Sequence, residues 1–274
     1  MADSPTFQSG TAASETLTGG AGQDVISGQG GADTLIGGDG NDGLYSGEFN
    51  VTTGSQPDLV GDRLDGGGGN DQLTGGSGND LLIGGAGTNN LIGGDGIDTA
   101  VYAGKRGDYT LASKDGLPGA VFASEGPRDT LTSVERLNFS DVSIAYDIDG
   151  NAGKMYRLYQ AALNRTPDKE GLGFWLKVAD NGGSLEGLAA GFTGSAEWAR
   201  LYGRESTDEL FLTNLYLNAL HREPDAAGFA FWLGAMDSGA TREQLLIGFS
   251  ESTENRAAVI GSIQDGIEYI PFAG

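Results

Sequence analysis

Several residue types are missing or scarce in this 274-residue sequence. It has no cysteine, one histidine, and 16 lysines and arginines against 38 aspartates and glutamates. Without cysteine there are no disulfides and no thiolate metal sites. The formal net charge of -22 argues against nucleic acid or an anionic membrane as a partner. No segment approaches the 18 or more apolar residues of a membrane-spanning helix. We therefore expect neither a nucleic-acid partner nor a membrane span.

Sequence motifs of the common catalytic centres are also missing. The H-E-x-x-H zinc motif, the G-x-S-x-G elbow and the P-loop do not occur. The single histidine, His221, replaces Asn164 of an internal repeat described below, which favours a surface or packing role. Carboxylates are abundant, so a two-carboxylate glycosidase stays open as an alternative. We expect no catalytic residues and a protein that is not an enzyme.

Glycine is abundant instead, with 49 residues concentrated in the first hundred positions. Many belong to a nine-residue phrase, G-G-x-G-x-D-x-U-x with U a large aliphatic residue, that is clearest at 19–27, 66–74 and 75–83. Its glycines allow a tight turn, and x-U-x forms a short strand with its aliphatic side chain inward. The inward positions are Ile26, Leu35, Leu44, Leu64, Leu73, Leu82 and Leu91.

This nonapeptide is a known calcium-binding repeat of parallel β-helices. Residues 10–102 resemble the RTX (repeats-in-toxin) family of bacterial type I secreted proteins. The resemblance implies a parallel β-roll (an RTX β-helix) in which one nonapeptide makes half a coil and 18 residues make a full turn. Each ion then lies between stacked Asp side chains and turn carbonyls. Hard oxygen donors without sulfur favour Ca²⁺ over zinc or copper, so several Ca²⁺ ions are the expected cofactor.

Stacking at 18-residue intervals places the acidic residues in pairs. Asp80 should pair with both Asp62 and Asp98. Asp71 should meet the neutral Asn89 and form a weaker site. The expected metal ligands are Glu15, Asp24, Asp33, Asp42, Asp62, Asp71, Asp80, Asn89 and Asp98.

The period breaks once, between Tyr45 and Gly61. Asp42 and Asp62 are 20 residues apart rather than 9. If the surplus loops out, Asp33 meets Asp62 and the register recovers. Polar stretches and a proline fit a surface loop. This loop is either a tolerated insertion or a segment that contacts a ligand.

The next region, 103–150, alternates turns with short β-rich phrases at 108–111, 120–123, 130–134, 136–139 and 142–146. Segments 96–102 and 129–139 resemble those that close many RTX rolls. An open solenoid end exposes core and unpaired strand edges, so we expect this region to cap the roll. Independent ligand binding is the alternative.

The last part of the chain is duplicated with an offset of 57 residues, so that 158–176 aligns with 215–233. Asp168 and Asp225 should cap helices, and Ser206 with Glu209 has capping-box spacing. The duplication predicts an all-α module with about four short helices in each copy.

Charged and aromatic residues recur in both copies. Arg165 and Arg222 each precede an aspartate by three positions, and we expect a structural Arg–Asp pair at each turn. The aromatic pairs are expected in the core, with a platform for stacking sugars as the alternative: Phe174 with Trp175, and Phe231 with Trp232.

This duplicated part, 151–270, resembles the bacterial domain family DUF4214, whose function is unassigned. The shared phrase is L-Y-x-x-x-L-x-R-x-P-D-x-x-G-x-x-F-W, which is also similar to phycobilisome linker domains. Those linkers are cytoplasmic and lack RTX repeats. DUF4214 domains often accompany RTX repeats in secreted or surface-layer proteins, which implies attachment to a surface, matrix or glycan.

The sequence therefore predicts a multidomain β plus α protein. Its parts are an N-terminal parallel β-roll at 1–102, a β-rich cap or linker at 103–150, and a C-terminal all-α duplicated helical module at 151–274. The first residues lack the basic and apolar regions of a cleaved N-terminal signal. The RTX resemblance implies export by type I secretion machinery through an uncleaved C-terminal signal. We expect a bacterial protein that is secreted or held at the cell surface.

The expected function is extracellular attachment or matrix and surface-layer assembly. The expected partners are an extracellular glycan, a cell-surface component, or another copy through self-association. Two alternatives stay open: the roll serves as an export and folding device for a helical cargo, or the protein is an extracellular polysaccharide hydrolase.

Overall fold

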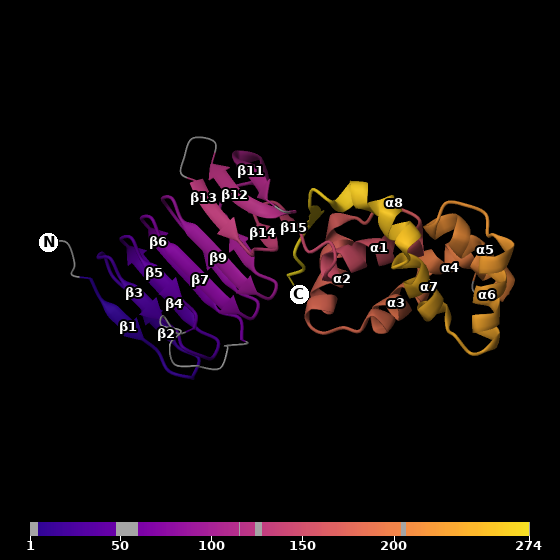
Figure 1. Ribbon diagram of the computed structural model, residues 1–274, viewed down its shortest axis with the longest axis horizontal. Coiled ribbons are helices and arrows are strands. Elements are labelled where there is room, and N and C mark those ends of the chain that lie inside the picture. The colour runs from indigo at the N-terminus through magenta and orange to yellow at the C-terminus, as the bar shows by residue number, and fades with distance from the viewer. Residues whose placement is uncertain (1–4, 48–59, 115, 124–127, 204–206, 274) are drawn as a thin grey trace. The chain divides into compact units, whose positions relative to one another are not determined.

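The computed structural model describes residues 5–47, 60–114, 116–123, 128–203 and 207–273. The chain divides into two compact units, one up to Tyr146 and one from Asp147 (Figure 1). The first is rich in strands and the second in helices. Each unit is described by itself.

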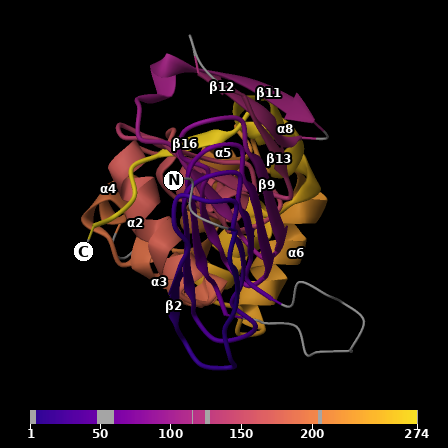
Figure 2. The same cartoon turned by 90° about the vertical axis from the view of Figure 1, so that its left-hand side faces the viewer.

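The strand-rich unit consists of two open sheets whose strands alternate along the chain (Figures 1 and 2). The strands within the repeats pair in parallel. The first sheet takes β1 (Phe7–Ser9), β3 (Val25–Ser27), β5 (Gly43–Tyr45), β7 (Gln72–Ser77) and β9 (Asn90–Asp95). The second takes β2 (Thr16–Thr18), β4 (Thr34–Asp39), β6 (Arg63–Gly68), β8 (Leu81–Ile83) and β10 (Thr99–Val101).

The register of these strands follows the 18-residue spacing of the sequence. Ile26 pairs with Leu44, and other neighbours within a sheet keep the same interval. Across the break in the repeat, Leu35 pairs with Leu64, and β5 pairs with β7 in the same shifted register. The surplus residues are therefore looped out as the sequence predicted. The loop itself, 48–59, lies outside the described residues, so its role stays an expectation.

A single file of aliphatic side chains forms the core between the sheets. Each is 0% exposed, and all seven predicted inward positions belong to it: Ile26, Leu35, Leu44, Leu64, Leu73, Leu82 and Leu91. Because neighbouring residues on a strand point to opposite faces, one inward residue per short strand is enough to fill the narrow space.

Further strands continue both sheets beyond the repeats. On the first sheet, β13 (Arg128–Thr132) runs parallel to β9 and is followed outward by the antiparallel β12 (Leu117–Ala123) and β11 (Tyr109–Lys114). On the second, β14 (Arg136–Asn138) runs parallel to β10 and pairs with the antiparallel β15 (Ser143–Ala145). Tyr102, Tyr109 and Phe139 pack together next to the aliphatic file. The core thus extends into the closing strands.

The described part of the helical unit contains eight α-helices and one short strand. They are α1 (Asn151–Leu163), α2 (Lys169–Asp180), α3 (Leu185–Thr193), α4 (Ala196–Tyr202), α5 (Asp208–Ala219), α6 (Ala226–Asp237), α7 (Arg242–Ser250), α8 (Thr253–Ile263) and β16 (Ile267–Tyr269). Helices α5 to α8 begin 57 residues after α1 to α4, so the sequence duplication is a structural one. None of the described helices is long and apolar enough to cross a bilayer.

Local sequence signals fix the helix starts. The Asp168 carboxylate accepts a hydrogen bond from the Gly171 N–H at the start of α2, and Asp225 does the same at α6. Ser206, predicted to begin α5, lies outside the described residues. The cap observed there is Thr207, whose hydroxyl accepts from the Leu210 N–H.

Candidate metal centre

A ladder of acidic side chains runs along the strand-rich unit, one residue before each strand. In each step the backbone N–H of one acidic residue donates to Oδ1 of the residue above it. Asp62 donates to Asp80 at 2.7 Å, and Asp80 donates to Asp98 at 2.8 Å. The same bond joins further pairs: Glu15 to Asp33, Asp24 to Asp42, Asp33 to Asp62, Asp42 to Asp71, and Asp71 to Asn89. The structure therefore brings all nine predicted residues into one stack.

The second carboxylate oxygen faces a different environment. The side chains of Asp42, Asp71 and Asp98 are at most 3% exposed, and their Oδ2 atoms have no hydrogen-bond partner in the described residues. A buried ionised oxygen without a partner is costly, and a bound cation removes that cost. These oxygens are therefore candidates for metal ligation.

Backbone carbonyl oxygens converge on the same places. A Cβ atom added to Gly66 would lie 2.5 Å from Asp71 Oδ2 and 2.8 Å from the Gly84 carbonyl oxygen of the next turn. The first glycine of a repeat thus leaves open a small space bordered by a carboxylate and a carbonyl. Such hard oxygens suit Ca²⁺, which accepts both kinds of ligand in flexible geometry. The donor set fits calcium.

No group of three or more His, Cys, Asp or Glu side chains that could hold a metal occurs in the described residues. A metal in the stack would therefore take most of its ligands from backbone carbonyls, with few side chains per ion. This arrangement differs from a preformed side-chain cage. It makes the site depend on the fold of the turns themselves.

Burial controls the electrostatics of the ladder. It raises the pKa of Asp71 to about 6, against the hydrogen bond from the Asp42 N–H and with repulsion from neighbouring carboxylates. Burial also raises the pKa of Asp98 to about 6, with added repulsion from Glu135. At Asp24, burial is outweighed by hydrogen bonds from the Thr6 side chain and from backbone N–H groups, and the pKa is lowered. The stack resists ionisation in its interior and tolerates it at its open end.

Two acidic residues that sequence reasoning missed continue the ladder past the repeats. The Asn89 N–H and side-chain amide donate to Asp129 Oδ1 at 2.9 and 3.0 Å. The Asp98 N–H donates to a Glu135 carboxylate oxygen at 2.9 Å. The signal was present as an acid two positions before an inward leucine, Leu131 or Leu137. It was overlooked because no glycine turn precedes either residue.

At the other end, the ladder starts without a buried acid. Both the N–H and the hydroxyl of Thr6 donate to Asp24 Oδ1, at 2.7 and 2.6 Å. The carboxylate of Glu15 accepts bonds from Thr11 within its own turn. Glu15 therefore joins the stack through its backbone, and its side chain is held locally.

The helical unit contains a different charged cluster, repeated in both copies. Arg165 makes two bonds to Glu197, at 2.7 and 3.2 Å, and one to Asp168 at 3.3 Å. In the second copy Arg222 binds Glu254 and Asp225 in the same way. The predicted Arg–Asp pairs are present, and the glutamate was missed. Each cluster joins the start of one helix to another and has the character of a structural clamp.

The aromatic residues divide between core and surface. The Trp175 ring stacks on Phe192 with 4.6 Å between ring centroids. The prediction that both phenylalanines lie in the core is wrong, because Phe174 is 39% and Phe231 67% exposed. Their helix is covered on one side only, so the periodic pattern could not distinguish core from outer face.

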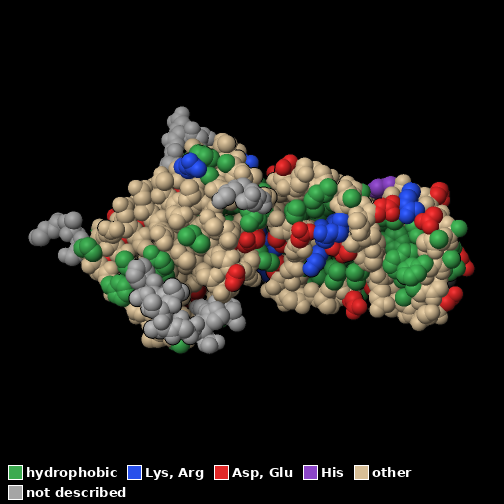
Figure 3. All heavy atoms as spheres, in the orientation of Figure 1, with side chains coloured by type: hydrophobic (Ala, Val, Ile, Leu, Met, Phe, Trp, Pro, Cys, Tyr) green, Lys and Arg blue, Asp and Glu red, His purple; other side chains and the backbone are tan. Residues whose placement is uncertain are grey.

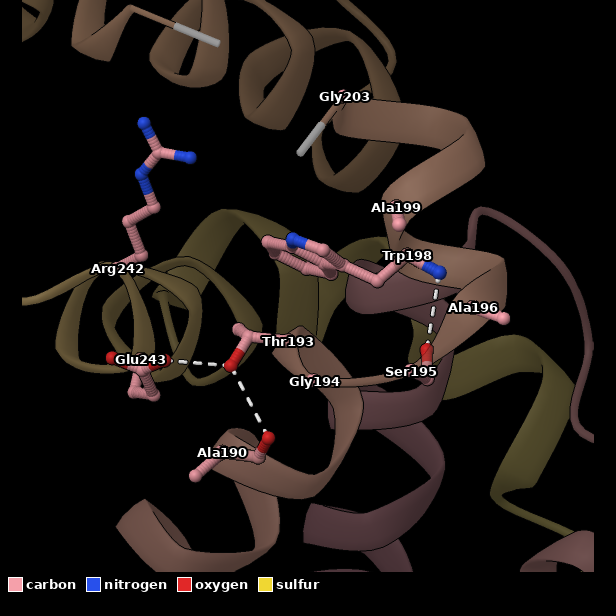
Figure 4. Close-up of a pocket in the computed structure, with 10 residues that line it drawn as sticks. All are labelled: Ala190, Thr193, Gly194, Ser195, Ala196, Trp198, Ala199, Gly203, Arg242 and Glu243. Carbon is pink, nitrogen blue, oxygen red and sulfur yellow. Dashed lines mark hydrogen bonds between the residues drawn. The ribbon is translucent and has the colours of Figure 1, made fainter. Parts of the chain in front are cut away.

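A hollow of about 550 Å³ lies beside α3, α4 and the start of α7 (Figure 4). The Thr193 hydroxyl donates to Glu243 at 2.6 Å, and the Glu243 pKa is lowered because this and other hydrogen bonds outweigh its burial. Trp198 lines the hollow but is only 4% exposed, and it stacks on Tyr202 at 3.9 Å between centroids. Its ring faces are therefore not open to a sugar.

Acid should stabilise the metal-free strand-rich unit. Asp71 and Asp98 have a pKa near 6 in the folded unit and an ordinary value of 3.8 when unfolded. The folded state therefore binds protons more tightly, and this stabilisation is present below pH 3.8 and lost as pH rises through 6. In excess chelator, circular dichroism should show more β structure at about pH 4.5 than at about pH 7.5. The reverse order would contradict it.

Comparison with known protein families gives two matches. A model described as the RTX calcium-binding nonapeptide repeat (4 copies) matches residues 9–44 and 62–100. A model described as a domain of unknown function, DUF4214, matches residues 154–201 and 189–259. Neither is an enzyme family. A search of curated proteins gave no match. The chain therefore carries calcium-binding RTX repeats in its strand-rich unit and DUF4214 sequence in its helical unit.

Proposed function

We propose that the strand-rich unit is a parallel β-roll that folds when several Ca²⁺ ions bind along its acidic ladder outside the cell. The observation that carries this proposal is the set of buried Oδ2 atoms on Asp42, Asp71 and Asp98 that lack a hydrogen-bond partner in the described residues. The ligands would be the carboxylate and amide oxygens of the nine predicted residues, together with turn carbonyls. Calcium supplies the positive charge that lets these oxygens remain buried.

Repulsion along the ladder supports the coupling of folding to metal. Two carboxylates about 5 Å apart repel by roughly 3 kcal/mol at an effective dielectric constant near 20. Several such pairs oppose folding until cations neutralise them, so metal-binding energy becomes folding energy. Weak extracellular sites, with dissociation constants near 10⁻⁴ M, each contribute only about 1.4 kcal/mol at millimolar calcium. Several ions acting together are needed, and folding should be cooperative in calcium.

This coupling suits secretion. RTX repeats are typical of type I secretion substrates that act outside the cell, where calcium is plentiful. A chain that stays unfolded without metal can pass through an exporter and fold on the far side. The acidic composition and the glycine turns serve both states.

We infer for the helical unit a role in extracellular attachment or surface-layer and matrix assembly. Its clamps and caps build a rigid double module, and its described residues show charged clusters held in internal ion pairs. Glycans, cell-surface components and further copies of the chain are the candidate partners.

Asp80→Ala should weaken calcium-induced folding more than Asp71→Ala does. Asp80 lies between two acids, Asp62 and Asp98, whereas Asp71 lies between Asp42 and the neutral Asn89. The midpoint of a calcium titration followed by circular dichroism should therefore shift further for Asp80→Ala. Equal midpoints would refute the ranking, and an unchanged wild-type spectrum after dialysis against EGTA would refute the coupling itself.

Gly66→Ala should also raise the calcium midpoint, several-fold, because the added Cβ would enter the space beside Asp71 Oδ2 and the Gly84 carbonyl. Gly47→Ala is the matched control, since a Cβ there meets nothing within 4 Å. The same titration compares them. A similar effect of both substitutions would show that general backbone stiffening, and not the oxygen-lined space, is responsible.

Labelled full-length chain, loaded with calcium, should be retained on a glycan array, on bacterial cells or on immobilised copies of itself. Excess unlabelled chain should displace it. Absence of retention on all three surfaces would favour the alternative in which the roll only exports and folds a helical cargo.

A further inference from the structure

Helix α6 (Ala226–Asp237) is apolar and none of its residues is buried. Phe231 is 67% exposed, and no charged residue occurs between Asp225 and Asp237. Hydrophobic side chains gather on the end of the helical unit that carries α5 and α6 (Figure 3). An exposed apolar surface of this kind marks an interaction site in soluble proteins.

The equivalent helix of the first copy, α2, differs in two respects. It carries three charged residues, Lys169, Glu170 and Lys177, where α6 has Ala226, Ala227 and Gly234. It also buries Leu172, Gly173, Leu176 and Ala179. The charges lost in α6 are those that would keep an uncovered helix in water.

The outer face of α2 is covered by the last segment of the chain. The Ile270 N–H donates to the Lys169 carbonyl at 3.0 Å, and the Phe272 ring packs edge-on against Phe174 at 5.2 Å. Lys169 also pairs with Glu268 at 2.6 Å. Within 147–203 and 207–273, no segment takes the corresponding place on α6. The duplication therefore shows a helix position that is covered once and left open once.

An extended segment does not fit α6 in the way it fits α2. The Ile270 carbonyl approaches Gly173 so closely that an added Cβ would overlap its oxygen. The residue of α6 at this position is Ala230, which has that Cβ. A strand-like tail is therefore kept away, whereas a second helix, whose axis packs 8–10 Å from its neighbour, is not.

We propose that α6 packs antiparallel against α6 of a second copy of this chain. The chain has a net charge of -22, so copies repel over most of their surface, and α6 offers an uncharged contact. In an antiparallel pair, Asp237 of each helix lies at the amino-terminal, positive end of its partner, which is favourable. The contact is isologous, with the same face on both copies. It rests on the proposed assembly function and names its partner.

Sedimentation velocity of the full chain in calcium tests this. The wild type should pass from monomer to dimer between about 1 and 100 µM, as expected for a small apolar interface. Phe231→Glu and Gly234→Lys should each remain monomeric, with at least a tenfold weaker dimer. Leu201→Glu, which alters an exposed leucine on α4, should dimerise like the wild type. A monomeric wild type, or dimers of both α6 variants, would overturn the proposal.

Cross-linking gives an independent reading, because the chain has no cysteine. Phe231→Cys should form a disulfide-linked dimer under mild oxidation, and Glu170→Cys, at an exposed site on α2, should not. Equal cross-linking of the two would overturn the α6 contact. Calcium-induced folding is followed by circular dichroism on the same samples. Loss of dimers with a normal calcium response rejects only the α6 contact, and loss of the calcium response alone rejects only the calcium proposal.

Discussion

The strand-rich unit depends on burying one acidic side chain at each turn. One carboxylate oxygen of each aspartate accepts a bond from the backbone of the turn below, which aligns successive turns. The other oxygen borders the first glycine of the repeat, where any Cβ would intrude. The aspartate, the glycine and the inward leucine are thus one device. The aspartate sets the register, the glycine leaves room, and the leucine fills the core.

The helical unit shows how a duplication keeps some features and changes others. Both copies retain the same clamp, in which an arginine binds a glutamate in two places and an aspartate in one. This clamp joins separate helices, so its loss would loosen each copy. The outer faces of α2 and α6 have no such constraint. They have diverged in charge and in what covers them, and this divergence is where a partner can be recognised.

Regular spacing made most of the first unit predictable. A period of nine with one aliphatic position gave the strand register, the inward file and the pairing across the insertion. Prediction failed where the period lost one of its marks. Asp129 and Glu135 continue the ladder without a glycine turn, and they reach it only because β13 and β14 return to the sheets. Phe231 failed for another reason, since an aromatic at helical spacing does not reveal which side of the helix a neighbour covers.

By itself, the sequence determined the local chemistry of this protein: oxygen ligands at fixed intervals, tight glycine turns, capped helices and two copies of one helical phrase. These follow from short-range sterics and hydrogen bonding, which neighbouring residues decide. Only the tertiary structure decided which carboxylate oxygens are left without partners, which acids outside the repeats join them, and which of two equivalent helices stays uncovered. Those outcomes depend on segments tens of residues apart in the chain, because burial is a property of the packed fold.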